Sequence, residues 1–284
     1  MNRMTTAFVL AGGGSLGAVE AGMLAALAEA GIRPDLVCGT SVGAVNGAWI
    51  AARPDTEGIK ALADLWISLS RNDIFPVCPP TITLGALRCI NYLVPNSGLR
   101  RILEKNLPYD KLEDAEIPIH VTATDVVHGE EVLLSTGDTV ESVLASTAIP
   151  GVFKPIRIGE LYLMDGGAVN NNPVSHAVMK GGDPVWVLPT GYACSLTEPP
   201  ATALDMVLQA VTLAVNHRLR LDIERYRDEV ELKVVPSLCP VHTSPADFSQ
   251  SKELIDRAHR QTREWLEAGA PAMPLHPDTG HPHS

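Results

Sequence analysis

Short apolar runs alternate with helix-like patterns along the first part of the chain. Residues 5–11 form an apolar run that ends in three glycines, which is typical of a buried strand entering a turn. Apolar residues then recur at helical spacing up to Gly31, a residue type that commonly ends a helix. A second short strand is expected at 36–38, followed by a helix of small residues that stops before Pro54. This strand–helix–strand–helix order predicts parallel βαβ units.

The rest of the chain carries the patterns of further strands and helices. Asp138 followed by Glu141 fits a capping box, which predicts that a helix begins at Thr139. The apolar run that turns at Gly159-Glu160 is typical of a hairpin and leads directly into Asp165. The remaining strands are expected at 117–124, 131–134, 185–188 and 229–235, and the helices at 58–70, 139–146, 203–227 and 254–266.

Composition agrees with a folded protein that has one core. The chain has 284 residues, of which 45% are hydrophobic and 19% charged, and this balance excludes a disordered chain. A chain of this length can enclose a single hydrophobic core and bury roughly 75% of the surface that it exposes when unfolded. No internal repeat and no Ser/Gly-rich linker divides the sequence. We therefore expect an α/β fold in which all elements contribute to one domain.

Charge and cysteine content limit the partners and the compartment. The formal net charge is −11 and the pI is about 5.2, so phosphate backbones and anionic lipid headgroups repel the protein. Nucleic-acid binding is not expected, and peripheral membrane contact has to be apolar and local. The five cysteines form no Cys-x-x-Cys pair, which suits a reducing compartment. Because the chain has neither a signal-peptide pattern nor an apolar run of about 20 residues, the sequence predicts a cytoplasmic protein.

The segment Gly39-Thr40-Ser41-Val42-Gly43 is a Gly-x-Ser-x-Gly motif between an expected strand and an expected helix. Gly39 and Gly43 let the backbone turn sharply, and such a turn presents the serine hydroxyl above the sheet. The amides that open the next helix then lie close to that hydroxyl. A glycine-rich turn in which the serine only caps a helix has the same composition. The strand before the motif and the helix after it favour a nucleophile at Ser41.

The glycines that follow the first strand allow two interpretations. Residues 12–17 read Gly-x-Gly-x-x-Gly, the fingerprint of dinucleotide binding, and Asp35 stands where an acid for the ribose is expected. The consecutive residues Gly12, Gly13 and Gly14 can equally present several N–H groups to a developing oxyanion. The serine motif favours the second interpretation. An acyl-transfer site needs a nucleophile and an oxyanion hole together, whereas a dinucleotide site gives no reason for the serine.

A serine nucleophile needs a general base, and the chain offers two kinds. His242 and His259 follow Asp165 in the Ser…Asp…His order of α/β-hydrolases, although the chain has no His-Gly-Gly-Gly loop. Asp165 itself is the other candidate, because it ends the expected hairpin, and Gly166 and Gly167 after it permit a close approach to another turn. A carboxylate of ordinary pKa is a weak base. Asp165 therefore has to be positioned and partly desolvated to act alone.

Four blocks of the sequence, taken together, resemble a known family. Their order and intervals are similar to those of the patatin-like phospholipase family over roughly Thr6 to Val178, and a weaker similarity resumes at 248–269. Each block alone is modest, but four in order are specific. The blocks are residues 12–17, residues 39–43, residues 145–153 (Ala-Ser-Thr-Ala-Ile-Pro-Gly-Val-Phe), and Asp165-Gly166-Gly167 with Asn172-Pro173.

The resemblance implies a three-layer α/β/α fold with a mainly parallel central sheet, and hydrolysis of lipid acyl esters with no calcium, other metal or cofactor. It implies a phospholipid or lysophospholipid substrate. Residues 6–178 are then the catalytic core, residues 179–269 complete the same domain, and residues 270–284, rich in proline and histidine, are expected to form a disordered tail. At the matching positions the nucleophile is Ser41 and the base is Asp165 without a histidine, the oxyanion hole is formed at Gly12, Gly13 and Gly14, and the supporting turns contain Gly17, Gly39, Gly43, Gly166 and Gly167.

One position departs from the family pattern. The glycine block commonly has arginine where this chain has Leu16, a change that keeps every N–H donor but removes a cation near the headgroup or the loop. The alternative function is therefore a catalytically idle lipid-binding or partner-binding protein of the same fold. The apolar segment from Ile74 to Val94 fits either a lid or interfacial surface that admits acyl chains, or a helix that completes the core.

Overall fold

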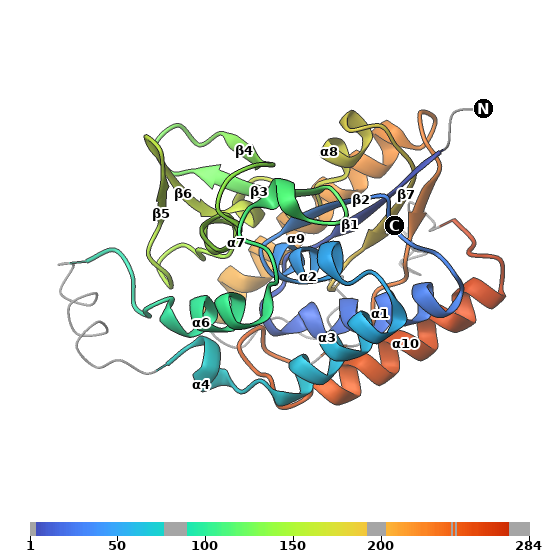
Figure 1. Ribbon diagram of the computed structural model, residues 1–284, viewed down its shortest axis with the longest axis horizontal. Helices are drawn as coiled ribbons and strands as arrows, with labels where there is room; N and C mark the ends of the chain where they lie inside the picture. The colour runs from blue at the N-terminus through green and yellow to red at the C-terminus, as the bar shows by residue number, and fades with distance from the viewer. Residues whose placement is uncertain (1–3, 77–89, 192–202, 240, 242, 273–284) are drawn as a thin grey trace, which may run out of the picture.

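A central β-sheet lies between two layers of helices in the computed structural model, which describes residues 4–76, 90–191, 203–239, 241 and 243–272 (Figure 1). Its described strands are β1 (Thr5–Leu10), β2 (Leu36–Thr40), β3 (Ile119–Asp125), β4 (Glu131–Leu134), β5 (Ile156–Ile158), β6 (Leu161–Asp165), β7 (Gly182–Leu188) and β8 (Leu232–Val234). The strand order is β5-β6-β3-β2-β1-β7-β8, and β4 pairs with β3. The neighbours from β3 to β8 pair in parallel, whereas β4 and β6 run antiparallel to β3, and β5 antiparallel to β6.

The helices divide between the two faces of the sheet. Helices α1, α3 and α10 lie on one side, and α8 and α9 lie on the other (Figure 1). The predicted three-layer α/β/α fold with a mainly parallel sheet is confirmed. The helix bounds are α1 (Gly17–Glu29), α2 (Val42–Ala52), α3 (Thr56–Ser68), α4 (Arg71–Ile74), α6 (Ser97–Asn106), α7 (Thr139–Ser146), α8 (Val174–Met179), α9 (Ala203–Tyr226) and α10 (Ser251–Glu267), with short 3-10 turns η1 (Gly14–Leu16), η2 (Leu112–Asp114) and η3 (Gly166–Ala168).

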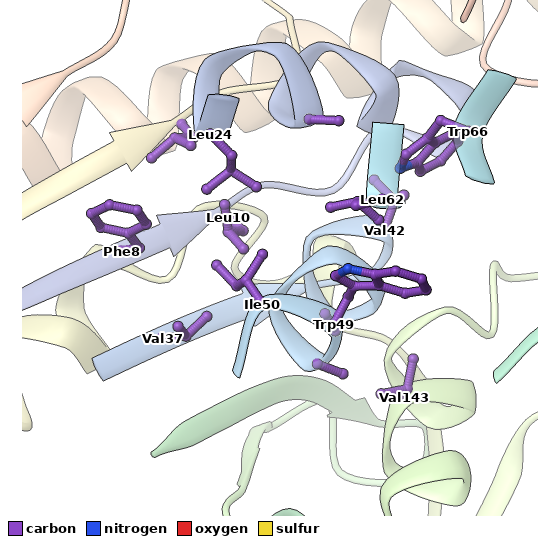
Figure 2. Close-up of a cluster of buried hydrophobic side chains, with 14 of the residues drawn as sticks. Phe8, Leu10, Leu24, Val37, Val42, Trp49, Ile50, Leu62, Trp66 and Val143 are labelled. Carbon is purple, nitrogen blue, oxygen red and sulfur yellow. The ribbon is translucent and has the colours of Figure 1, made fainter. Parts of the chain in front are cut away.

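Alternate residues of β1 enter two different hydrophobic layers. Phe8 and Leu10 join the layer that packs under α1, α2 and α3, whereas Ala7 and Val9 join the layer under α8 and α9. This division follows from the two-residue period of a strand. Because both faces of β1 are covered, the strand is apolar at successive positions, as parallel sheets between helices are. Figure 2 shows the first of these layers, in which Leu10 lies directly below Leu24 of α1 in the view.

Several local signals predicted where elements begin and end. Asp138 accepts a hydrogen bond from the Glu141 amide at 2.8 Å and caps α7 at the expected residue. Gly31 adopts a φ of +75°, the left-handed conformation that ends α1. The hairpin β5–β6 is also confirmed and delivers Asp165 at its end. Helices α4, α6 and α8 were not expected. Helices α4 and α8 have only four and six residues, too few to show a helical period, whereas Leu99, Ile102 and Leu103 of α6 do recur at helical spacing.

The C-terminal part of the chain contributes to the same sheet. β7 pairs with β1, β8 pairs with β7, and α10 packs along α1. We infer that residues 179–269 complete one domain with residues 6–178. Most of the expected tail (273–284) and much of the apolar segment between Ile74 and Val94 (77–89) lie outside the described residues.

Three observations bear on the expected location. Within the part of the chain that the structure describes, no helix combines the length and the hydrophobicity needed to cross a bilayer. Cys38 is a free thiol buried in β2. Cys239, by contrast, is disulfide-bonded, which the scattered cysteine pattern did not predict.

Candidate active site

The sheet brings three turns to one edge. The glycine turn follows β1, Ser41 follows β2, and Thr190 follows β7, and these three strands are parallel neighbours. The carboxyl ends of parallel strands meet at the same edge, where α/β folds place their ligands. Asp165 reaches this edge from an antiparallel strand. It lies opposite Ala123 of β3, and the preceding β3 residue, Thr122, lies opposite the end of β2.

Ser41 sits on a tight turn between β2 and α2. Its φ of 53° and ψ of −123° are unusual for a residue with a side chain, and such strain persists only where the surroundings enforce it. A Cβ on Gly43 would lie 2.2 Å from the Leu10 carbonyl oxygen, and one on Gly39 would lie 2.5 Å from the Gly43 carbonyl oxygen. Only glycine fits at these two positions. The Ser41 amide donates to Ser146 Oγ at 2.8 Å, which further fixes the turn.

The Ser41 hydroxyl donates a hydrogen bond to Asp165. The distance from Ser41 Oγ to Asp165 Oδ2 is 2.6 Å, and both side chains belong to residues only 7% exposed. The other carboxylate oxygen, Oδ1, accepts from the Gly167 amide at 2.7 Å. A Cβ on Gly166 would lie 2.3 Å from the Thr122 carbonyl oxygen, so the turn after the carboxylate needs glycine to approach β3. The two motifs therefore form one hydrogen-bonded pair.

Burial changes the acid–base properties of Asp165. Desolvation raises the pKa of its carboxyl group to about 6, and the hydrogen bonds from Ser41 and Gly167 offset only part of this effect. A carboxylate whose pKa is close to neutrality is a stronger base than an exposed aspartate, and it is still ionised at pH values above its pKa. This is the condition under which a carboxylate can act as a base without a histidine.

The amides of the glycine turn differ in their hydrogen bonding. The Gly12 amide donates to the Asn171 carbonyl oxygen at 3.2 Å, and the Ser15 amide donates to the Pro245 carbonyl oxygen at 2.8 Å. Among the described residues, the amides of Gly13 and Gly14 have no hydrogen-bond acceptor. The hydrogen bonds favour the amides of Gly13 and Gly14 over that of Gly12 as oxyanion donors, and the oxyanion hole at Gly12, Gly13 and Gly14 stays a prediction.

The start of α1 packs closely against α2 and α3. A Cβ on Gly17 would lie 2.4 Å from Val42 Cγ2 and 2.7 Å from Trp66 Cζ2, so this glycine is required by packing. Leu16, where the resemblance leads us to expect arginine, packs as a partly buried residue against the hydrophobic core. A long cation would not find the same apolar surroundings there. Leu16 is therefore a packing residue of the glycine turn in this chain.

A buried polar network supports the glycine turn, and sequence patterns gave no sign of it. Glu20 of α1 is fully buried and accepts from the Ala11 amide at 2.6 Å and from Asn46 Nδ2 at 2.7 Å. Asn46 Nδ2 also donates to the Gly17 carbonyl oxygen at 3.0 Å, and its Oδ1 accepts from Trp66 Nε1 at 2.9 Å. Desolvation raises the pKa of Glu20 well above its usual value. One amide side chain thus joins α1, α2 and α3 beneath the turn.

Replacing Asn46 by alanine is expected to lower the free energy of unfolding by about 3–5 kcal/mol, because it leaves a buried carboxyl oxygen and the Trp66 N–H without partners. Asn106→Ala is the matched control. Its side chain makes one local hydrogen bond, to the Ile102 carbonyl oxygen at 2.8 Å, and its loss is expected to cost about 1 kcal/mol or less. Urea unfolding of the two variants measures both changes. If Asn46→Ala lowers the free energy of unfolding by less than Asn106→Ala does, the role of Asn46 in the network is contradicted.

An apolar pocket opens beside Ser41. Its space, counting the part open to solvent, is about 750 Å³. Phe75 and Phe153 stack with their ring centroids 5.3 Å apart, and Trp66 and Phe248 stack at 6.0 Å, and all four rings line this pocket. Of the sixteen other lining residues, eleven are valine, leucine or isoleucine. The serine hydroxyl therefore faces a space suited to hydrocarbon.

The described histidines lie elsewhere. His259 is on α10, with Nε2 2.8 Å from Glu29 Oε2, and this pairing occupies it away from the serine. The other histidine of the α/β-hydrolase alternative, His242, lies outside the described residues. None of the described histidines is hydrogen-bonded to Ser41 or Asp165. Within the same described ranges, no group of three or more His, Cys, Asp or Glu side chains is arranged to hold a metal ion.

Comparison with known proteins decides the family. The sequence model described as patatin-like phospholipase matches residues 8–178, which is more than half of the chain and includes every residue of the serine and aspartate turns. The chain belongs to the patatin-like phospholipase family. The match also contains the glycine turn, so the family region carries all three parts of the site described above.

Curated relatives in this family are much longer than the chain. Patatin-like phospholipase domain-containing protein 6 of Mus musculus is 30% identical over 190 residues, which is 66% of this chain and 14% of that protein. An uncharacterised NTE family protein of Mycobacterium tuberculosis is 30% identical over 167 residues, which is 59% of this chain and 27% of that protein. The chain thus spans about one seventh to one quarter of the length of these relatives.

Solved structures support the fold of this patatin-like chain. VipD from Legionella pneumophila superposes with a TM-score of 0.50 at 18% identity, covering 94% of this chain and 67% of that one. Human GIVD cytosolic phospholipase A2, solved with methyl gamma-linolenyl fluorophosphonate, superposes with a TM-score of 0.50 at 13% identity, covering 94% of this chain and 58% of that one. At these identities the likeness concerns the fold alone.

Proposed function

We propose that this chain is a serine acyl hydrolase that cleaves carboxylic esters of lipids, a phospholipid or a lysophospholipid, through the dyad of Ser41 and Asp165. The family assignment supports lipid ester hydrolysis as the class of reaction. The observation that carries the finer proposal is the 2.6 Å hydrogen bond from Ser41 Oγ to a buried carboxylate oxygen of Asp165. A nucleophile within hydrogen-bond reach of a base is the arrangement that covalent catalysis requires.

In the first step, Asp165 Oδ2 takes the hydroxyl proton as Ser41 Oγ attacks the ester carbonyl carbon. The free amides of Gly13 and Gly14 donate to the negative charge that develops on the carbonyl oxygen. The bond from the carbonyl carbon to the alkoxy oxygen then breaks, and Asp165 returns the proton to the leaving alcohol. The acyl group is left as an ester on Ser41. No metal is needed in this scheme, because the carboxylate supplies the base and the amides stabilise the oxyanion.

In the second step, water replaces the alcohol. Asp165, again ionised, accepts a proton from the water as its oxygen attacks the acyl carbon on Ser41. The tetrahedral intermediate uses the same two amides, and its collapse returns the proton to Ser41 Oγ and releases the carboxylic acid. The apolar pocket beside Ser41 holds the hydrocarbon part of the acyl group through both steps.

The pH dependence follows from the pKa of Asp165. Only the ionised carboxylate can accept the serine proton, so kcat/KM is expected to be constant at higher pH and to fall below the carboxyl pKa of about 6. The fall is expected to approach about tenfold per pH unit. A pH–rate profile of kcat/KM with a neutral ester substrate measures this. An inflection near pH 4, the pKa of an ordinary aspartate, would contradict the dyad. A second fall in kcat/KM on lowering the pH, with an inflection above pH 6 that comes from a histidine, would also contradict it.

The proposed function is tested by hydrolysis of a p-nitrophenyl ester and of a lysophospholipid by the wild-type chain and by Ser41→Ala. We expect the wild-type chain to hydrolyse both compounds and the variant to retain only the background rate. Activity that survives in folded Ser41→Ala excludes this nucleophile. A wild-type chain that hydrolyses neither compound favours the catalytically idle lipid-binding alternative.

A further inference from the structure

The apolar pocket extends along one face of α2, starting at the nucleophile. Val42, Val45 and Trp49 all line it, and their spacing of three and four residues places them on the same side of the helix. Ser41 directly precedes α2. Trp49 is eight residues beyond Ser41, which corresponds to about 12 Å along the helix axis.

Trp49 is held firmly at that distance. Its Nε1 donates to the Gly58 carbonyl oxygen at 2.7 Å, and the guanidinium carbon of Arg53 lies 4.6 Å from its ring centroid. The residue is 7% exposed. Figure 2 shows its indole projecting from α2 beside Val42 and Leu62, which line the same pocket. With a hydrogen bond at its edge and a cation over its ring, the indole cannot swing away without losing both contacts.

Helix α6 also lines the pocket and is followed by a segment that contacts α2. Leu103 and Leu107, at the end of α6 and just after it, also line the pocket. Two residues further on, Tyr109 Oη donates to the Ala48 carbonyl oxygen at 2.8 Å, directly beside Trp49 in sequence. The segment after α6 is therefore tied to the C-terminal part of α2. A hydrocarbon chain that follows α2 from Ser41 meets this junction.

We propose that Trp49 is the residue that limits the length of the acyl chain. This inference rests on the proposed function and specifies its substrate class as esters of medium-length, unbranched fatty acids. An extended chain of about eight to ten carbons spans a length equal to the roughly 12 Å of helix axis from Ser41 to Trp49. Longer chains have to leave part of their length outside the pocket or displace the indole. Each methylene left outside loses about 0.8 kcal/mol of favourable burial free energy.

The test is the kcat/KM of p-nitrophenyl esters with acyl chains from four to sixteen carbons, measured below their aggregation limits. We expect the wild-type optimum at about eight to ten carbons. Trp49→Phe and Trp49→Ala both shorten the side chain, so each is expected to raise the ratio of kcat/KM for the fourteen-carbon over the eight-carbon ester, by about tenfold or more for alanine. Trp49→Phe keeps the proposal testable if the alanine variant fails to fold.

Trp186→Phe is the matched control. Trp186 is also 7% exposed, but it packs edge-to-face on Trp265 and does not line the pocket. We expect this variant to keep the wild-type chain-length profile. An unchanged profile in both Trp49 variants, or an equal shift in Trp186→Phe, overturns the role of Trp49.

A binding measurement separates failure of this inference from failure of the proposed function. Calorimetric titration of Ser41→Ala and of Ser41→Ala/Trp49→Phe with free fatty acids of eight and fourteen carbons needs no catalysis. We expect the first protein to prefer the shorter acid and the second to bind the longer acid relatively more tightly. The same preference in both proteins overturns the inference even when hydrolysis depends on Ser41.

Discussion

Asp165→Asn is expected to lower kcat by about 10³-fold at pH 8 and, at the same pH, to make the fold more stable. The loss of activity follows because the amide of asparagine cannot accept the Ser41 proton, and a positioned general base contributes about 10²–10⁴-fold. The measurement is steady-state hydrolysis at saturating ester.

The gain in stability follows from the raised pKa of Asp165. Burial raises the pKa of its carboxyl group to about 6 in the folded protein, from an ordinary value of 3.8. Above pH 6 the carboxylate is ionised in both states, so the folded state bears the full cost of the buried charge. As the pH falls from 6 to 4, the folded state binds the proton first and stability rises. Asparagine removes the charge, so it is expected to stabilise the fold by up to about 3 kcal/mol above pH 6. This difference from the wild-type chain is expected to shrink toward zero as the pH falls from 6 to 4.

Asp125→Asn is the control for both effects. Asp125 lies at the end of β3, and hydrogen bonds from His128 and the Val127 amide hold the pKa of its carboxyl group below the usual value. Its ionised form therefore stabilises the fold at neutral pH, and the asparagine variant is expected to be less stable and fully active. Urea unfolding at pH 8 compares the two variants. The changes in the free energy of unfolding are expected to have opposite signs. An Asp165→Asn enzyme that keeps its activity would contradict the assignment of Asp165 as the base.

Gly13→Ala is expected to lower kcat by about 10²–10³-fold, the usual loss when an oxyanion donor is displaced. A Cβ on Gly13 would lie 2.3 Å from Thr190 Oγ1 and 2.7 Å from Thr190 Cβ. Thr190 Oγ1 donates to the Gly12 carbonyl oxygen at 2.6 Å, so the threonine cannot move without releasing the glycine turn. The turn has to shift instead, and the amides of Gly13 and Gly14 move with it.

A second substitution distinguishes this steric effect from a general loss of folding. Thr190→Gly removes the atoms that a Cβ at position 13 would meet, so Gly13→Ala/Thr190→Gly is expected to recover part of the lost kcat relative to Gly13→Ala. Gly191→Ala, at the residue after Thr190, is the control, because a Cβ there would meet only Leu16 Cδ1 at 3.7 Å, an ordinary contact. It is expected to keep wild-type kcat. No recovery in the double variant, at equal stability, would contradict the steric argument.

Local motifs predicted the chemistry of the site because each part of it is a turn. A glycine-flanked serine, a run of glycines and an Asp-Gly-Gly turn each have strict backbone requirements, and those requirements limit which residues can occupy the positions. Joining Ser41 to Asp165 needed more than the motifs. Their contact depends on the register of β6 on β3 and of β3 on β2, and before the fold was known only the resemblance to the family linked them.

Other parts of the site have no local signature. Glu20, Asn46 and Trp66 meet beneath the glycine turn from three different helices, and an acidic residue within an apolar helix shows no sign in sequence of a buried partner. The Gly12 amide donates to the Asn171 carbonyl oxygen, 159 residues away, and this contact distinguishes the amide of Gly12 from those of Gly13 and Gly14. Such long-range contacts follow from packing of the whole chain, so sequence patterns alone could not distinguish among the three expected oxyanion glycines.

The central claim is that Ser41 is a nucleophile activated by Asp165, and covalent labelling tests it most directly. The measurement is the intact mass of the wild-type chain, Ser41→Ala and Asp165→Asn after exposure to an alkyl fluorophosphonate, followed by peptide mapping of the adduct. The account predicts one adduct on Ser41 in the wild-type chain, none in Ser41→Ala, and much slower labelling of Asp165→Asn. A wild-type chain that stays unlabelled, or an adduct that forms equally in Ser41→Ala, would contradict it.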